Sequence, residues 1–138
     1  MAHETEFYIG GRWVDPVEPG RWITVTDPAT EEELARVASA SLADVEAAVN
    51  AAHEAFPAYS VVGREDRLAL LRRFLEVYRK RMPEIAALMT SEVGIPKTFS
   101  ERVQARIGEW HLQTIIDVLE TYEFEQRRET TLVAREHI

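Results

Sequence analysis

Histidines are the first candidates for metal or proton-transfer chemistry in this chain, because it contains no cysteine. The four histidines are far apart in the sequence, at His3, His53, His111 and His137. Two histidines four residues apart on a helix can bind zinc, but the residue four positions after His53 is Pro57. The absence of cysteine also removes disulfides, thiolate ligands and cysteine nucleophiles. We therefore expect no metal site and no catalytic residue among these positions.

Charged clusters provide the next candidates. The glutamates at 31–33, and Glu123 with Glu125, could divide acid–base work between them, since paired carboxylates can differ widely in pKa. Such groups are rarely buried together without partners, so a solvated face is the expected state. The segment 64–81 has seven basic and three acidic residues and could form a docking face, although a solvated helix is the favoured interpretation.

Glycine and serine patterns do not add a site. Gly10 and Gly11 suit a hairpin turn, and the other glycines are isolated, so the chain has no glycine-rich loop for a phosphate. No serine lies in the motif that exposes a nucleophile between a strand and a helix. The residues alone therefore predict no catalytic, cofactor-binding or metal-binding residue in this chain.

Size and charge narrow the class of protein. The chain has 138 residues, of which 24 are acidic and 16 basic, for a net charge of −8, and its length is typical of one domain. The acidic balance argues against nucleic acids and anionic membranes, because these partners select basic surfaces. No apolar stretch approaches the ~20 residues that span a bilayer, and the first residues do not resemble an export signal. We expect a cytoplasmic protein.

Residues 1–40 have the pattern of two β-hairpins. Phe7–Ile9 and Arg12–Val14 are aromatic and β-branched runs, joined by two glycines that tolerate positive φ. A second pair of strands is predicted at Trp22–Thr26 and at 34–38, joined through a turn that contains Pro28.

Residues 41–126 have helical periodicity, which predicts four helices. Ser41 can cap the first helix together with Asp44, and Pro57 is expected to end it. The second helix begins after Gly63 and is expected to end at Pro83, because a proline ring clashes with the preceding helical turn. The same proline suits the first position of the third helix.

The end of the third helix and the start of the fourth have clear signals. Gly94 followed by Pro96 is a typical helix stop. Thr98 with Glu101 then forms a capping-box pattern for a final helix that runs to about Gln126.

The last helix and the end of the chain are both expected to pack against other segments. Between residues 110 and 122 apolar residues occupy most of the circumference of the helix, so it expects cover on several sides. Residues 130–138 are strand-like, and we expect this strand to pair with a partner edge such as that of a neighbouring chain. The predicted fold class is α+β and mainly helical, with two N-terminal hairpins, four helices and a C-terminal strand.

The order of several segments resembles the N-terminal part of the aldehyde dehydrogenase superfamily. The matching segments are FYIGGRWV at 7–14, TDPATE at 26–31, DVEAAVNAAHEAF at 44–56, Arg67 with LLRR at 70–73, and EVGIP at 92–96. Together they cover nearly the whole chain. The resemblance implies that residues 1–138 form one N-terminal segment that stops before the dinucleotide-binding sheet and the catalytic domain.

The resemblance also implies the chemistry of the parent family. Members oxidise aldehydes to acids through a cysteine thiohemiacetal, hydride transfer to NAD or NADP, and attack by a water that a glutamate assists. None of these groups can be assigned here, because the chain has no cysteine and ends before the cofactor-binding residues. One hypothesis is therefore an aldehyde dehydrogenase fragment that is inactive alone and binds no cofactor. The alternative is a stand-alone helical interaction module, and both hypotheses predict a homo-oligomer that associates through exposed apolar helix surface.

Overall fold

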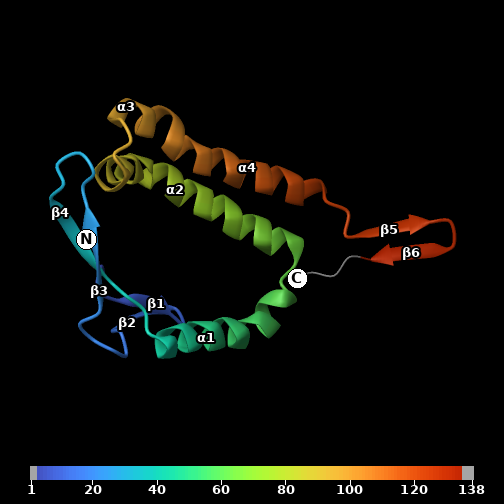
Figure 1. The fold of residues 1–138 in the computed structure, drawn as a ribbon. Coiled ribbons are helices and arrows are strands. Elements are labelled where there is room, and N and C mark those ends of the chain that lie inside the picture. Colours follow the sequence, from blue (N-terminus) through green and yellow to red (C-terminus); the bar gives the residue numbers. More distant parts are fainter. Residues whose placement is uncertain (1–2, 135–138) are drawn as a thin grey trace.

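The computed structural model describes residues 3–134, with the side chains of 126–128 excepted, and shows a mainly helical chain with three small antiparallel hairpins (Figure 1). The elements follow in the order β1 (Phe7–Ile9), β2 (Arg12–Val14), β3 (Trp22–Thr26), β4 (Glu33–Ala38), α1 (Leu42–Ser60), α2 (Arg64–Val93), α3 (Lys97–Phe99), the π-helical turn η1 (Ser100–Gln104), α4 (Ala105–Thr121), β5 (Glu125–Arg128) and β6 (Thr131–Ala134). Helices α2 and α4 lie side by side, and α1 lies apart from them beside β1.

The two N-terminal hairpins are confirmed. Phe7 lies opposite Val14 in the β1–β2 pair, and Gly10 and Gly11 take φ values of 60° and 81° in the turn between them. A side chain at either position would strain this turn, which explains the choice of glycine. In the second hairpin β3 pairs with β4, with one irregularity in register after Val25.

Helix α1 begins as predicted but does not end at Pro57. The Ser41 side chain accepts a hydrogen bond from the Asp44 backbone, and the Asp44 carboxylate accepts one from the Ser41 backbone, which forms the capping box. The helix then continues to Ser60. Pro57 is exposed, so the carbonyl that it leaves without a partner faces water rather than a dry core.

Helix α2 is one continuous helix, so the predicted division at Pro83 is wrong. Its ends agree with the sequence signals, since Gly63 is the N-cap and Gly94 is a left-handed C-cap with φ of 73°. Pro83 is exposed in the same way as Pro57, which again allows water to solvate the unpaired carbonyl. The predicted second and third helices are therefore one element of 30 residues.

The final helical segment is more complex than the single helix that the sequence predicts. Pro96, not Thr98, is the N-cap, and no side chain bonds the start of α3. The π-helical turn η1 then separates α3 from α4. Its first residue, Ser100, is fully buried and accepts a hydrogen bond of 3.1 Å from the Thr90 hydroxyl of α2. This buried polar contact fixes the turn against α2.

Helix α4 ends at Thr121, so the prediction that it reaches Gln126 is wrong. The backbone of Tyr122 is already extended, and the chain continues into a hairpin of β5 and β6. The predicted terminal strand is thus present at Thr131–Ala134, but it pairs with the preceding strand of its own chain. Residues 135–138 of that prediction lie outside the described residues, and pairing with a neighbouring chain stays a prediction.

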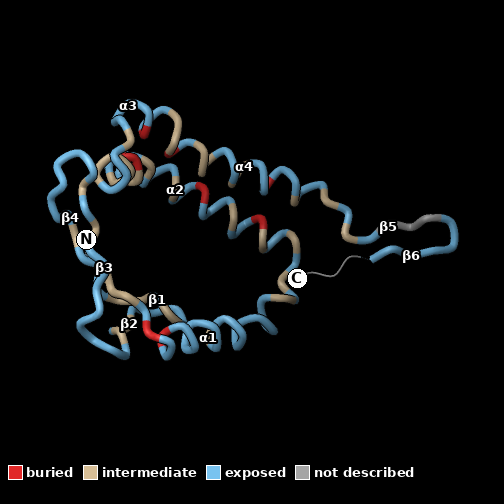
Figure 2. Tube along the Cα trace, viewed as in Figure 1, coloured by how far each residue is buried: buried red, intermediate tan, exposed pale blue. Residues whose placement is uncertain are grey.

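A small apolar core lies between α2 and α4 (Figure 2). Leu68 and Leu75 of α2 and Ile116 of α4 are almost fully buried. Leu71, Leu112 and Leu119 are partly buried and pack around them. No helix in the described part of the chain is long and apolar enough to cross a membrane.

Candidate functional site

The structure does not gather the histidines into a site. His53 of α1 and His111 of α4 are exposed on separate helices, and His137 lies outside the described residues. His3 stacks on Trp13 with ring centroids 4.2 Å apart and contacts Glu6. Within residues 3–134 there is no group of three or more His, Asp or Glu residues that could hold a metal ion.

The acidic clusters lie on the surface. Glu31, Glu32 and Glu33 are exposed around the turn between β3 and β4, and Glu33 pairs with Arg36. Glu123 and Glu125 are exposed beyond the end of α4. The exposure of these carboxylates agrees with the solvated-face interpretation.

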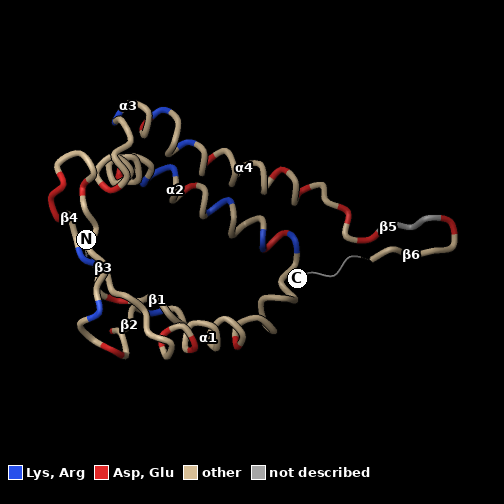
Figure 3. The backbone as a smooth tube through the Cα atoms, in the orientation of Figure 1, with Lys and Arg blue, Asp and Glu red and all other residues tan. Residues whose placement is uncertain are grey.

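Basic residues are distributed along α2, with acidic residues on the neighbouring α4 (Figure 3). Arg79 donates to Glu109 of α4 at 2.7 Å, and Arg72 pairs with Glu120 of the same helix. Lys80 pairs with Glu76 one turn away on α2. The basic segment therefore ties α2 to α4 and supports its own helix, which favours a structural role over a docking face.

Two arginines bind the ends of other helices, and the sequence patterns did not reveal this role. The Arg64 guanidinium donates to the backbone carbonyls of Glu120 and Tyr122 at the end of α4. Arg67 donates to the carbonyls of residues 59, 60 and 62, at the end of α1. Carbonyls at a helix C-terminus carry partial negative charge, so each arginine serves as a charged cap. The one sequence signal for this capping role is that both arginines lie in the first turn of α2, next to the preceding loop.

Asp44 joins the N-terminal hairpin region to α1. It is buried, and its carboxylate accepts hydrogen bonds from the Val17 backbone at 2.9 Å, the Ser41 backbone at 2.8 Å and the Ser41 hydroxyl at 2.7 Å. These bonds favour the ionised form and lower the pKa of Asp44, with the Val17 amide making the largest contribution. Because its carboxylate only accepts hydrogen bonds here, Asp44 fixes the loop at Val17 to the start of α1 rather than acting as a proton donor.

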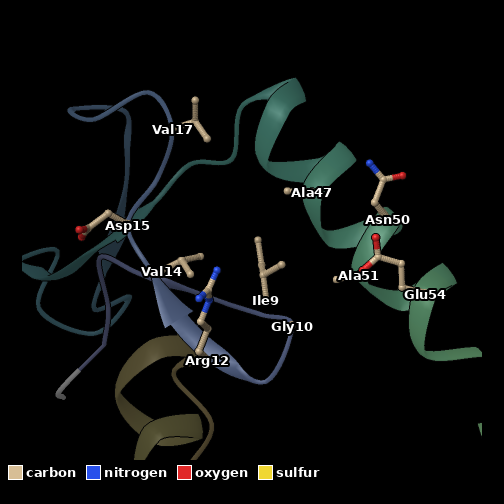
Figure 4. Close-up of a pocket in the computed structure, with 10 residues that line it drawn as sticks. All are labelled: Ile9, Gly10, Arg12, Val14, Asp15, Val17, Ala47, Asn50, Ala51 and Glu54. Atoms are coloured by element: carbon tan, nitrogen blue, oxygen red, sulfur yellow. The ribbon is translucent and has the colours of Figure 1, made fainter. Parts of the chain in front are cut away.

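An open hollow of about 500 Å³ lies between the β1–β2 hairpin and α1 (Figure 4). Arg12 reaches it from the hairpin, and Asn50 and Glu54 reach it from α1. The remaining lining is largely apolar, with Ile9, Val14 and Ala51 among its members. The lining offers polar groups for hydrogen bonds but no nucleophile with an adjacent base.

A second, apolar groove follows the outer face of α4 and the segment after it. Its volume is about 330 Å³, and it is lined by Thr114, Ile115, Val118, Leu119, Tyr122 and Phe124. Ile115 and Val118 are each more than half exposed. The rings of Tyr122 and Phe124 meet edge to face at 4.9 Å, and Arg64 lies over Phe124 at 5.4 Å. The groove can bury apolar side chains but has no group for chemistry.

A comparison with family models matches residues 13–136 to the aldehyde dehydrogenase family. The chain belongs to this family. A Staphylococcus aureus relative whose name assigns it to the aldehyde dehydrogenases is 38% identical over all 138 residues. These residues correspond to 29% of the relative, so the chain spans less than a third of the length of the curated aldehyde dehydrogenases that it matches.

Solved aldehyde dehydrogenases share the fold of this segment. A mutant of aldehyde dehydrogenase C from Pseudomonas syringae, in complex with NAD⁺ and octanal, has a TM-score of 0.91 and 35% identity; the match covers 96% of this chain and 27% of that one. An aldehyde dehydrogenase from Bartonella henselae has a TM-score of 0.89 and 31% identity, with coverage of 95% and 28%. The aldehyde dehydrogenase resemblance is thus confirmed, for an N-terminal part of the family fold.

This aldehyde dehydrogenase chain exposes many large apolar side chains. Large apolar side chains are exposed on all three long helices, including Val49 and Phe56 of α1, Leu70 and Phe74 of α2, and Trp110 of α4. Exposed apolar surface of this extent usually marks contact with another part of a protein. The exposed apolar side chains of the three helices are therefore candidates for packing contacts.

Proposed function

We propose that this chain is the N-terminal part of an NAD(P)-dependent aldehyde dehydrogenase and that it supplies scaffold rather than catalytic groups. The observation that carries the proposal is the match over the whole chain to less than a third of each longer relative. In this view residues 1–138 form one segment that precedes the dinucleotide-binding sheet and the catalytic domain. The parent enzyme would oxidise an aldehyde to a carboxylic acid.

The adjacent glycines of this chain do not form a dinucleotide-binding loop. Gly10 and Gly11 form the β1–β2 turn rather than a loop before a helix. The chain also lacks the cysteine on which the family resemblance places aldehyde oxidation. Binding of NAD or NADP is therefore assigned to the parent enzyme, and we expect the chain to be inactive alone.

A chimera tests this proposal. Residues 1–138 replace the equivalent segment of the Staphylococcus aureus relative, and formation of NADH or NADPH is measured with a panel of aldehydes. The chimera is expected to turn over, whereas the relative with that segment deleted and the isolated chain are expected to give only the blank rate. Turnover by the isolated chain that survives repurification would contradict the proposal, and so would a folded chimera without activity.

The alternative function, a stand-alone interaction module, rests on the same exposed apolar residues. The comparisons favour the aldehyde dehydrogenase part, because the match extends over the whole chain rather than over one helical surface. Homo-oligomerisation through this surface and a cytoplasmic location stay predictions. Sedimentation over a range of concentrations checks the first, and polydisperse growth is the result expected of an uncovered packing surface.

A further inference from the structure

Two short links connect the α2–α4 pair to its neighbours along the chain. Residues 61–63 join α1 to α2, and residues 122–124 join α4 to β5. Both links lie outside the helices and strands, and such segments are where a fold bends most easily. The direction of α1 and that of the β5–β6 hairpin therefore depend on what fixes these two links (Figure 1).

Arg67 holds the link between α1 and α2. Its Nε donates to the Val62 carbonyl at 2.9 Å, and its Nη2 donates to the carbonyls of Ser60 at 3.1 Å and Tyr59 at 3.2 Å. The guanidinium also lies over the Tyr59 ring, 5.0 Å from its centroid. A planar group with several donors can make all these contacts at once, so one side chain binds both the last residues of α1 and the link that follows them.

Arg64 holds the link between α4 and β5 in the same way. Its guanidinium donates to the Glu120 carbonyl at 3.3 Å and to the Tyr122 carbonyl, on either side of the last residue of α4, Thr121. It also lies over the Phe124 ring at 5.4 Å, and this ring meets the Tyr122 ring edge to face. The backbone and the aromatic rings of this link are thus tied to α2.

Both arginines reach the links from a single turn of helix. They lie three residues apart in the first turn of α2, so they are neighbours on its surface. The next residue, Leu68, is 2% exposed and belongs to the core between α2 and α4. This turn is therefore fixed to the helical pair, while its two guanidinium groups hold the segments that lead away from the pair.

We propose that the first turn of α2 is a conformational anchor, in which Arg64 sets the direction of the β5–β6 hairpin and Arg67 sets the direction of α1. The inference goes beyond the proposed function and does not depend on it, because it concerns contacts among residues 59–124. Loss of either arginine is expected to release one link and to leave the core of the helical pair intact.

The two links differ in their other support. A Cβ at Gly94 would lie 2.8 Å from Cγ of Pro28, so the β3–β4 turn closely approaches the far end of α2, and Asp44 joins the start of α1 to the loop at Val17. Helix α1 is thus restrained at its start as well as at its end. The β5–β6 hairpin projects from the end of α4, and all four residues of β6 are exposed (Figure 1). The loss of Arg64 should therefore have the larger effect.

Distances between pairs of spin labels test the anchor. The chain has no cysteine, so introduced cysteines take the labels at chosen positions. Ala87→Cys on α2 is the common reference, and it is combined with Thr130→Cys in the hairpin turn or with His53→Cys on α1. All three positions are exposed, so the labels are expected not to disturb the core.

Each arginine is expected to affect its own label pair. Arg64→Gln should widen the distribution of distances between the hairpin label and the reference about twofold and leave that of α1 unchanged. Arg67→Gln should widen the distribution for α1 by a smaller factor and leave that of the hairpin unchanged. Arg81→Gln is the matched control, because it removes the same charge from α2 outside the first turn, and it should change neither distribution.

A third label pair reports on the helical pair itself. It joins Ala87→Cys to His111→Cys on α4, which is also exposed, and its distances should stay the same in every variant, with helix content checked by circular dichroism. An unchanged distribution in Arg64→Gln or in Arg67→Gln would overturn the role of that arginine. Equal widening of the hairpin and α1 pairs by one variant, or any widening of the α2–α4 pair, would overturn the anchor as a whole.

Discussion

The α2–α4 pair and the region formed by α1 with the N-terminal hairpins differ in what holds them together. Helices α2 and α4 bury Leu68, Leu75 and Ile116 against each other, and Arg79 bridges the pair to Glu109. Helix α1 contains one buried residue, and that residue is the charged Asp44. Its apolar residues, such as Val49 and Phe56, are about half exposed or more.

The α2–α4 pair is therefore stabilised by its own apolar core, whereas the α1 region has almost no buried apolar side chains. The helical pair has a dry apolar contact, which is the main source of folding free energy. The α1 region is held by local caps and by hydrogen bonds at Asp44, which contribute much less net stability. Substitutions in the two regions should therefore have very different effects on the isolated chain.

The largest difference is expected between Leu75→Ala and Val49→Ala. Leu75 is 3% exposed in the core, and removal of such a side chain leaves a cavity and costs about 2–5 kcal/mol of unfolding free energy. Val49 is 60% exposed on α1, and its removal is expected to cost less than about 0.5 kcal/mol. Urea denaturation of the two variants measures both values. Similar losses would mean that α1 packs as firmly as the helical pair.

Gly108→Ala tests how closely α2 and α4 approach each other. A Cβ at Gly108 would lie 2.6 Å from Cζ of Tyr78, whose hydroxyl donates a 2.8 Å hydrogen bond to the Ala105 carbonyl. The ring must move and weaken this bond, so a loss of about 1–3 kcal/mol is expected. The same substitution at Gly63 meets no atom within 4 Å of the added Cβ, so the smaller loss expected there reflects only the replacement of glycine by alanine at the N-cap of α2. Thermal unfolding of the two variants ranks them, and an undiminished melting temperature for Gly108→Ala would show that the contact is loose.

The features predicted from the sequence are those that neighbouring residues determine. The glycine turn of the first hairpin, the Ser41–Asp44 capping box and the stop at Gly94 each depend on a few adjacent positions. The sequence predicts helix ends at Pro57 and Pro83, but a proline inside a helix weakens it without always ending it, and both positions are exposed, so water can solvate the carbonyl left unpaired. Exposure at these two positions follows from tertiary structure, which local sequence does not contain.

The end of α4 could not be predicted for a related reason. Arg64 donates to the Glu120 carbonyl from 56 residues away in the sequence, and it binds the Tyr122 carbonyl as well. No glycine marks this helix end, so a local pattern continues past it. The sequence predicts that apolar residues lie around most of the last helix, but it does not predict a groove. Its position at Ile115 and Val118 depends on where the chain turns after Thr121.

A smaller effect is expected from Ser41→Ala, which breaks the capping box of α1. The Ser41 hydroxyl accepts from the Asp44 backbone and donates to its carboxylate, so its loss leaves a helix-start amide unpaired. The expected cost is about 0.5–2 kcal/mol, confined to α1. Hydrogen exchange of amides in α1 and in α2 measures it, and faster exchange in α2 would show that the two regions unfold together.

The Asp44 carboxylate also gives the α1 region its own pH dependence. The pKa of Asp44 is lowered in the folded chain by the Val17 amide and by the Ser41 amide and hydroxyl. The ionised form therefore stabilises the fold above the unfolded value of about 4, and this stability is lost as pH falls through the lowered folded pKa. The protection factor of the Val17 amide, which takes account of the pH dependence of exchange itself, should fall below about pH 4. Asp44→Asn removes the ionisable group, and persistence of the same pH step in this variant would assign it to another group.

The smallest effect is expected at the ion pair between α2 and α4. Arg79 is 50% exposed and Glu109 17% exposed, so solvent screens much of their attraction. Arg79→Gln should lower the unfolding free energy by about 0.2–1 kcal/mol at low salt and by less at high salt. Urea denaturation at two salt concentrations measures this. Arg81→Gln is the control, since Arg81 pairs with the exposed Glu84 of its own helix. A loss at Arg79 as large as that at Leu75 would show that charge, rather than the apolar core, holds the helical pair together.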